Sequence, residues 1–187
     1  MVKNLRPLSV LLFFISIFLT GAVLFENPFH YSVSFQIPVW SAGTNIPVTV
    51  RAGNTASYSA NGEGYLFIVS GRNQNDAIIK TVQRYRVSTN TWDTLAPHPT
   101  GLLGGATTIL GDTLYITGGV INPPGAGINT VAKYSITQNI WSVAANFPAG
   151  IADAKAVSYQ DSIIYVGGGL SGLSSAGLLY MYNAKSN

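Results

Sequence analysis

The chain has 187 residues, of which 47% are hydrophobic, 9% are charged and 20 are glycine. Helical proteins normally carry many Glu, Lys and Ala residues on their solvated faces, so this composition favours short β-strands joined by tight turns. The formal net charge of +3 provides no basic patch for nucleic acid. The lack of cysteine in the sequence excludes thiol catalysis and a cysteine-ligated metal site.

The N-terminus has the form of an export signal. Lys3 and Arg6 precede the uncharged segment Leu8–Leu24, and the small residues Thr20–Ala22 stand at the place of a cleavage site. An apolar segment of about 18 residues is also at the short end of what crosses a bilayer as a helix. We therefore expect residues 1–22 to form either a signal peptide or an uncleaved anchor helix. In both cases the rest of the chain is expected to be secreted or on the cell surface.

Residues 23–52 are expected to be a linker that contains one strand, Phe35–Trp40. A proline follows Trp40 after seven residues, and the same spacing separates Trp92 and Trp141 from the prolines that follow them. This spacing predicts that Phe35–Trp40 is the last strand of a repeat whose first three strands are missing from this end of the chain.

Beyond the linker, one pattern of residues occurs three times. An apolar run ends in a pair of small residues, a tyrosine follows, and in the first two copies a tryptophan comes seven residues after the tyrosine. The apolar runs with their small pairs are Leu66–Gly71, Leu114–Gly119 and Ile164–Gly169. Equivalent residues lie about 49 positions apart, a period that indicates an array of identical supersecondary units.

Each unit is predicted to be a four-stranded antiparallel meander. The first two strands are expected at 56–60 and 65–69, at 105–110 and 113–117, and at 154–159 and 162–166. The turn at Gly111-Asp112 is a strong hairpin signal, and the third copy has one extra residue near Gln160, which suggests a bulge. A single sheet cannot bury both of its faces, so neighbouring sheets are expected to pack face to face around a ring.

This arrangement resembles the Kelch repeat of β-propellers over about residues 40–187. The residues that carry the resemblance are Ser70, Gly71, Tyr85 and Trp92, then Gly118, Gly119, Tyr134 and Trp141, then Gly168, Gly169 and Tyr182. Two features depart from the family pattern. Ser70 replaces the first glycine of the first copy, and no arginine stands at the start of the first strand, where the family often has one. The resemblance implies an all-β, incomplete propeller with repeats at 53–101, 102–150 and 151–187, the third truncated before its last strand.

The predicted ring is open. Propellers typically have four to eight blades, so three blades and one strand require the remaining blades to close the ring. We expect the sequence to be a fragment of a longer product or a truncated reading frame. In the family an N-terminal strand commonly completes the last blade, and Phe35–Trp40 is placed to do so.

The longer loops are expected to share one rim of the ring. They join second to third strands at 72–80, 120–130 and 170–178, and fourth to first strands at 96–103 and 145–153. Loops on a rigid scaffold usually carry function, so this rim is the predicted partner-binding face. Its most polar members are Arg72, Asn73, Gln74, Asn75 and Asp76. These residues could hydrogen-bond a glycan or a peptide, but they also fit an ordinary solvated loop. His98, between two prolines, is a further candidate.

No catalytic residue, cofactor site or metal site is predicted. Asp112 and Asp161 occupy hairpin turns, where Asp caps its own backbone, and the carboxylates show no spacing for general acid and base work. The expected function is a protein- or glycan-binding or scaffold module. The alternative is a carbohydrate-active enzyme, of the epimerase, oxidase or lyase type, with its catalytic residues in the missing blades.

Overall fold

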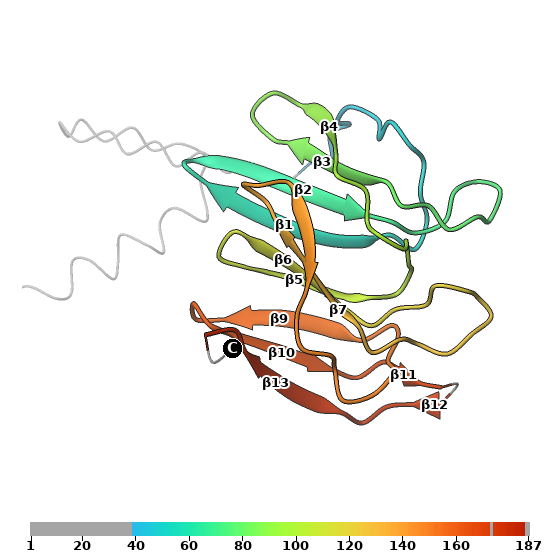
Figure 1. Ribbon diagram of the computed structural model, residues 1–187. Helices are drawn as coiled ribbons and strands as arrows, with labels where there is room; N and C mark the ends of the chain where they lie inside the picture. The colour runs from blue at the N-terminus through green and yellow to red at the C-terminus, as the bar shows by residue number, and fades with distance from the viewer. Residues whose placement is uncertain (1–38, 173, 186–187) are drawn as a thin grey trace, which may run out of the picture. The chain divides into compact units, whose positions relative to one another are not determined.

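The computed structural model describes residues 39–172 and 174–185 (Figure 1). The expected signal or anchor helix and residues 35–38 of the expected linker strand lie outside these described residues. Val39 and Trp40 are described and belong to no strand. Ala42–Asn187 forms one compact unit, which holds every strand of the described residues. In those residues no helix is long and apolar enough to span a membrane.

Three antiparallel sheets follow one another along the chain, which confirms the predicted all-β architecture. The first sheet contains β1 (Asn54–Ala60), β2 (Glu63–Val69), β3 (Val82–Arg86) and β4 (Thr91–Leu95). The second contains β5 (Ala106–Leu110), β6 (Thr113–Thr117), β7 (Val131–Ser135) and β8 (Ile140–Val143). Both have the strand order of a meander, β1-β2-β3-β4 and β5-β6-β7-β8.

The third sheet has three strands, in the order β13-β10-β9. They are β9 (Lys155–Tyr159), β10 (Ile163–Gly167) and β13 (Leu179–Asn183). The loop before β13 contains a two-residue hairpin, β11 (Leu170–Ser171) and β12 (Ser174–Ser175), which the sequence did not predict. The side of β13 that carries β4 or β8 in the other sheets is therefore without a strand in the described residues.

The first hairpin of each sheet shows where the extra residue of the third copy lies. Ala60 pairs with Glu63 and Leu110 with Thr113, which leaves two turn residues, whereas Tyr159 pairs with Ile163 and leaves three. The register of β9 with β10 is continuous. The suggested bulge is therefore wrong, because the turn itself accommodates the additional residue.

The sheets stack through their first strands, with β1 beside β5 and β5 beside β9. Successive side chains of β6 point alternately toward the first and the third sheet, as a strand buried on both faces requires. Leu114 packs with Phe67 of the first sheet, whereas Tyr115 packs with Ile164 of the third. The second sheet is therefore the middle layer, and the first strands lie innermost, as in a propeller.

The small pair at the end of each second strand has a left-handed backbone. Gly118 and Gly119 have φ of 71° and 96°, and a Cβ on Gly118 would overlap the carbonyl oxygen of Ile151 in the next repeat. Ser70 adopts the same conformation, with φ of 56°. The serine therefore preserves the local backbone geometry of the first sheet at the expense of a strained residue.

Candidate binding rim

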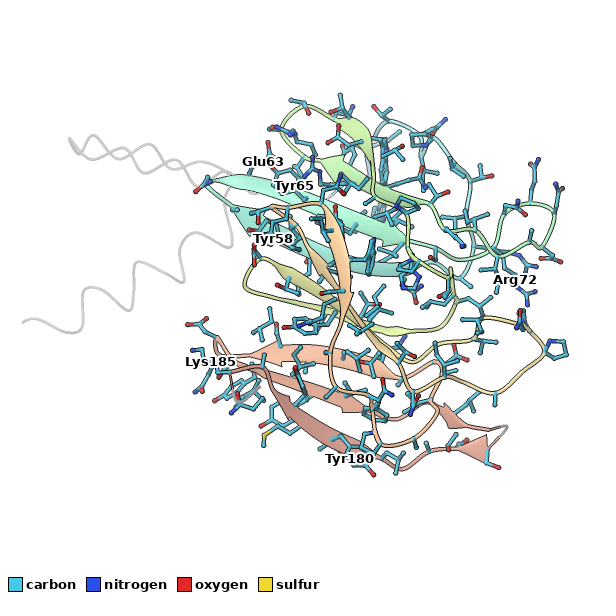
Figure 2. The ribbon with its side chains drawn as sticks, viewed as in Figure 1. Tyr58, Glu63, Tyr65, Arg72, Tyr180 and Lys185 are labelled. Atoms are coloured by element: carbon cyan, nitrogen blue, oxygen red, sulfur yellow. The ribbon has the colours of Figure 1, made fainter. Side chains whose placement is uncertain are left out.

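The long loops gather at one end of the compact unit, at the right in Figure 1, and the first hairpin turns lie at the other end. In Figure 2, Arg72 lies at the loop end, while Tyr58, Glu63 and Tyr65 lie toward the opposite end. We call the loop end the rim. It contains the segment Arg72–Asp76 and the starts of β1, β5 and β9, where two hollows lie.

The polar loop Arg72–Asp76 is shaped by the side chain of Asn73. Asn73 Oδ1 accepts hydrogen bonds from the backbone N–H groups of Asn75 (3.0 Å) and Ala77 (3.1 Å). The Asp76 carboxylate pairs with Arg51, in a pair exposed enough to contribute little to stability. Asn73 therefore fixes the turn, and Gln74 and Asn75 are exposed at its tip.

The first hollow is a groove of about 190 Å³ beside this loop. Arg51 and Arg72 are among its lining residues, and they exchange two backbone hydrogen bonds of 2.9 Å. The Nε–H of Arg72 is buried and has no hydrogen-bond partner among the described residues. Arginine side chains are hydrogen-bond donors, so a groove lined by Arg51 and Arg72 suits a ligand that brings a carbonyl or carboxylate oxygen.

The second hollow, of about 300 Å³, lies where the first strands of the three sheets begin. Ala52, Gly104 and Asp153 hold equivalent positions there, with φ of 52°, 64° and 55°. Its lining is polar and includes Asp153 and Lys155. Because each sheet contributes a segment, the hollow exists only when the repeats are assembled.

Buried Asn54 ties the first two repeats together at this hollow. Its Nδ2 donates to the carbonyl oxygen of Val69 (3.0 Å), and its Oδ1 accepts from the N–H of Gly105 (2.7 Å). Asn54 is only 3% exposed. Its polar atoms therefore serve the scaffold, and the charged groups available to a ligand are those of Asp153 and Lys155.

His98 is not on the rim surface, and the prediction that it is a rim residue is wrong. It is 3% exposed, lies edge-on to the Trp141 ring at 4.6 Å, and accepts the Gly101 N–H at Nδ1 (3.1 Å). Burial, with a smaller effect from Lys80, lowers the pKa of His98 to about 4. The imidazole is therefore neutral at pH 7 and acts as a packing group between two sheets.

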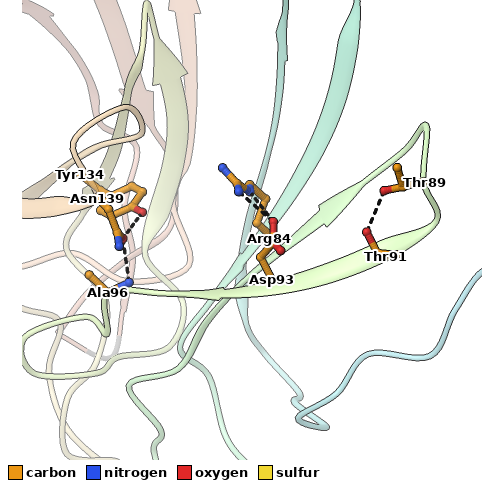
Figure 3. A network of polar contacts seen from close by, with 7 residues as sticks. All are labelled: Arg84, Thr89, Thr91, Asp93, Ala96, Tyr134 and Asn139. Atoms are coloured by element: carbon orange, nitrogen blue, oxygen red, sulfur yellow. Dashed lines mark hydrogen bonds and ion pairs between the residues drawn. The ribbon is translucent and has the colours of Figure 1, made fainter.

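Sequence reasoning missed an asparagine that links each tyrosine to the preceding repeat. In Figure 3, Asn139 Oδ1 accepts from the Tyr134 hydroxyl (2.6 Å) and from the Ala96 N–H (2.8 Å). Trp141 Nε1 donates to the carbonyl oxygen of Ala96 (2.9 Å). We call this set of hydrogen bonds, made by a Tyr, an Asn and a Trp of one repeat to one backbone residue before it, the bracket. Here that backbone residue is Ala96, which lies four positions after Trp92, the tryptophan of the preceding repeat.

The first sheet has the same bracket. Asn90 Oδ1 accepts from the Tyr85 hydroxyl (2.7 Å) and from the Thr44 N–H (2.8 Å), and Trp92 Nε1 donates to the Thr44 carbonyl (3.0 Å). Asn90 and Asn139 also have positive φ, 53° and 57°. The signal for them in the sequence is an asparagine five residues after each signature tyrosine.

The acidic residues form no catalytic cluster in the part of the chain that the structure describes. No group of three or more His, Cys, Asp or Glu side chains there could hold a metal ion. Asp112 was expected to cap its own backbone, but its carboxylate accepts hydroxyl hydrogen bonds from Thr113 (3.3 Å) and Thr137 (2.8 Å). This aspartate joins the two hairpin turns of the second sheet.

The fold and the bracket define a repeat protein built from antiparallel sheets of three or four strands that stack through their first strands. A family profile of the Kelch motif matches residues 102–148, which contain the whole second sheet. Kelch-like protein 15 of Gallus gallus is 36% identical over 56 residues, a segment that makes up 30% of this chain and 11% of that protein. The chain thus spans a small part of this relative. These matches show a Kelch motif over the second sheet, and the first and third sheets repeat the geometry of that sheet.

Proposed function

We propose that the chain is a protein-binding module that holds a polar segment of a partner at the rim. The observation that carries the proposal is the groove that Arg51 and Arg72 line beside the exposed Gln74. Peptide carbonyls and acidic side chains supply acceptors for the guanidinium donors of these arginines. Kelch repeats suggest the same general role, a binding module on a rigid scaffold.

The two hollows suit an extended segment better than a small molecule. Both lie at the rim and are open rather than enclosed, and the hollow at the strand starts is mainly polar. The groove offers the cations Arg51 and Arg72, while the hollow at the strand starts offers Asp153 and Lys155. An acidic stretch that enters the groove and continues toward Lys155 would meet positive charge at both places.

A selection from a peptide library, followed by calorimetry with the selected peptide, tests this proposal. The rim variant Q74A/N75A/K155A changes three exposed side chains and should weaken binding at least about tenfold. The matched control T89A/D161A changes exposed turn residues at the opposite end and should bind as the unmodified chain does. Equal loss in both variants, or no effect in either, would refute a rim site.

Glycans are the other ligand class predicted for this rim, and a glycan array is the second arm of the test. Binding to glycans without binding to peptides would assign the module to carbohydrate recognition. The enzyme alternative gains no support from the described residues. Turnover of a sugar substrate that one rim substitution abolishes would replace the binding proposal.

We further propose that the module works outside the cytoplasm, attached to a membrane only if its N-terminal segment stays uncleaved. Support comes from the charge-free segment Leu8–Leu24 behind Lys3 and Arg6. A fusion of the chain to a reporter that is active only after export should be active. Deletion of residues 1–22 should abolish that activity. Mass spectrometry of the exported product would show whether its N-terminus has been cleaved.

A further inference from the structure

The turn between β1 and β2 joins an asparagine to a glycine at the end of the molecule opposite the rim. Ala60 pairs with Glu63, so Asn61 and Gly62 are the two residues of the turn. Their φ angles are 52° and 76°, and two positive values in succession are typical of a type I′ hairpin turn, which favours Asn-Gly. No other asparagine of the sequence is followed by a glycine.

The turn leaves both residues open to solvent. Asn61 and Gly62 are exposed, and nothing lies within 4 Å of the place that a Cβ on Gly62 would take, its chain neighbours apart. Among the described residues, no hydrogen bond involves the Gly62 N–H or the Asn61 side-chain amide. The nearby Glu63 carboxylate instead accepts from the N–H groups of Gly64 (2.9 Å) and Ser88 (3.1 Å). The amide of Asn61 and the N–H of Gly62 are therefore both free to react.

These two groups can react with each other. The backbone nitrogen of Gly62 forms a bond to Cγ of Asn61 and loses its proton, while the side-chain nitrogen of Asn61 leaves as ammonia. The product is a five-membered succinimide ring. Water then adds to one of the two ring carbonyls and opens the ring, which gives aspartate or isoaspartate at position 61. Glycine favours the first step, because it has no Cβ to obstruct the attacking nitrogen.

We propose that Asn61 is a modification site at which the folded chain deamidates spontaneously. The structure protects other asparagines that are equally exposed. Asn75 is exposed, but the N–H of Asp76, which would be the attacking group, donates to the Asn73 carbonyl (3.1 Å). Its nitrogen is therefore held away from the Asn75 side chain.

The two bracket asparagines are protected at the side-chain amide itself. Asn90 and Asn139 are exposed, but Oδ1 of each accepts hydrogen bonds from a tyrosine hydroxyl and a backbone N–H. The residues after them, Thr91 and Ile140, are β-branched, so their side chains crowd the attacking nitrogen. Position 61 thus combines a free amide, a free N–H and a following glycine.

The fold slows this reaction without preventing it. Ring closure requires rotation of the turn about Asn61, which the pairing of Ala60 with Glu63 opposes. Six further residue pairs hold β1 and β2 together. The turn can therefore rearrange while the rest of the hairpin stays paired, because local opening at the end of a hairpin costs less free energy than global unfolding.

Either product adds a negative charge beside Glu63. The formal net charge of +3 falls by one unit, so ion exchange separates the product from the starting chain. The new charge lies at the end of the molecule that carries Glu63 and Tyr65, away from Arg72 and the rim (Figure 2). Deamidation is therefore expected to leave the groove at the rim unchanged.

Peptide mapping by mass spectrometry of the folded 187-residue chain, incubated at mildly alkaline pH, tests the proposal. Asn61 should convert to a mixture of aspartate and isoaspartate at least about tenfold faster than Asn75 converts. Freshly purified N61D provides the aspartate product as a standard. An enzyme that methylates isoaspartate should label the incubated chain more than the fresh one.

The variant G62A adds a Cβ next to the attacking nitrogen and should slow the conversion at least about tenfold. The control G111A makes the same change in the equivalent turn of the second sheet, where a Cβ also meets nothing within 4 Å, and should leave the rate at Asn61 unchanged. An Asn61 that stays an amide in the folded chain would overturn the proposal, whether or not it converts in guanidinium. An unchanged rate in G62A, or an equal rate at Asn75, would overturn it as well.

Discussion

Replacing Asn139 by alanine removes the acceptor that Tyr134 and Ala96 share across two sheets. Tyr134 is fully buried, so its hydroxyl would have no water molecule in place of the lost partner. Asn139 also has a φ of 57°, which asparagine tolerates better than alanine does. The substitution therefore acts through two hydrogen bonds and one backbone conformation.

The expected loss of stability can be divided among these three effects. An orphaned buried hydroxyl costs about 1 to 3 kcal/mol, the partly solvated N–H of Ala96 about 0.5 to 1.5 kcal/mol, and alanine in the left-handed region about 1 kcal/mol. The sum is about 2.5 to 5.5 kcal/mol. Asn90 makes the equivalent bonds at an exposed site, where water replaces the asparagine, so N90A should cost only about 1 to 2 kcal/mol.

Urea unfolding followed by tryptophan fluorescence measures these differences. N139G, which removes the bonds but suits the backbone, should recover about 1 kcal/mol relative to N139A. If N139A is too unstable to measure, N139D takes its place. It keeps an acceptor, so its free energy of unfolding should be close to that of the unmodified chain. An N139A variant as stable as N90A would refute the reasoning, because it would show that the buried bracket stabilises no more than the exposed one.

Three further substitutions test other parts of the scaffold. His98 has a folded-state pKa of about 4, below its ordinary 6.5, so the unfolded state binds the proton first and stability should fall as the pH drops from about 6.5 to about 4. Unfolding at pH 7 and pH 4.5 should differ by about 2 to 3 kcal/mol more in the unmodified chain than in H98N; equal differences would contradict this. S70G should raise the midpoint of urea unfolding, by about 1 kcal/mol of stability, because it relieves a positive φ and removes a buried hydroxyl without a partner; a lower midpoint would show that Ser70 contributes a contact of its own. G118A should lower the thermal midpoint by several degrees, since its Cβ would overlap the Ile151 carbonyl, and an unchanged midpoint would mean that the sheets can move apart.

The sequence predicted the parts of the fold that depend on local pattern. The strand Thr113–Thr117 was predicted with the bounds that the structure has, because alternation and a glycine-containing turn define it within a few residues. Tyr134 and Trp141 were predicted as signature residues seven positions apart, and they pair with each other across β7 and β8. These features follow from chemistry that each repeat contains by itself.

The sequence did not reveal features that depend on the neighbouring repeat. His98 stands between two prolines in a polar loop, which suggests exposure, but the indole of Trp141, from the next repeat, covers it. Asn90 and Asn139 were missed, because their acceptor role depends on a backbone N–H more than forty residues upstream. The side chains of the candidate rim were divided into loop-shaping and exposed groups only by the structure.

Equivalent positions with different exposures show what decides burial in this chain. Leu66, Leu114 and Ile164 hold one position in three repeats, are all large and apolar, and yet are 37%, 0% and 2% exposed. Residue type cannot account for the difference, since a leucine occurs at both extremes. The deciding factor is whether a preceding sheet is present, as it is for the second and third sheets. Burial of Leu66 therefore requires one more sheet on its face, and a hydrogen-exchange experiment that finds the amides of β2 as protected as those of β6 in solution would show that such a sheet is in place.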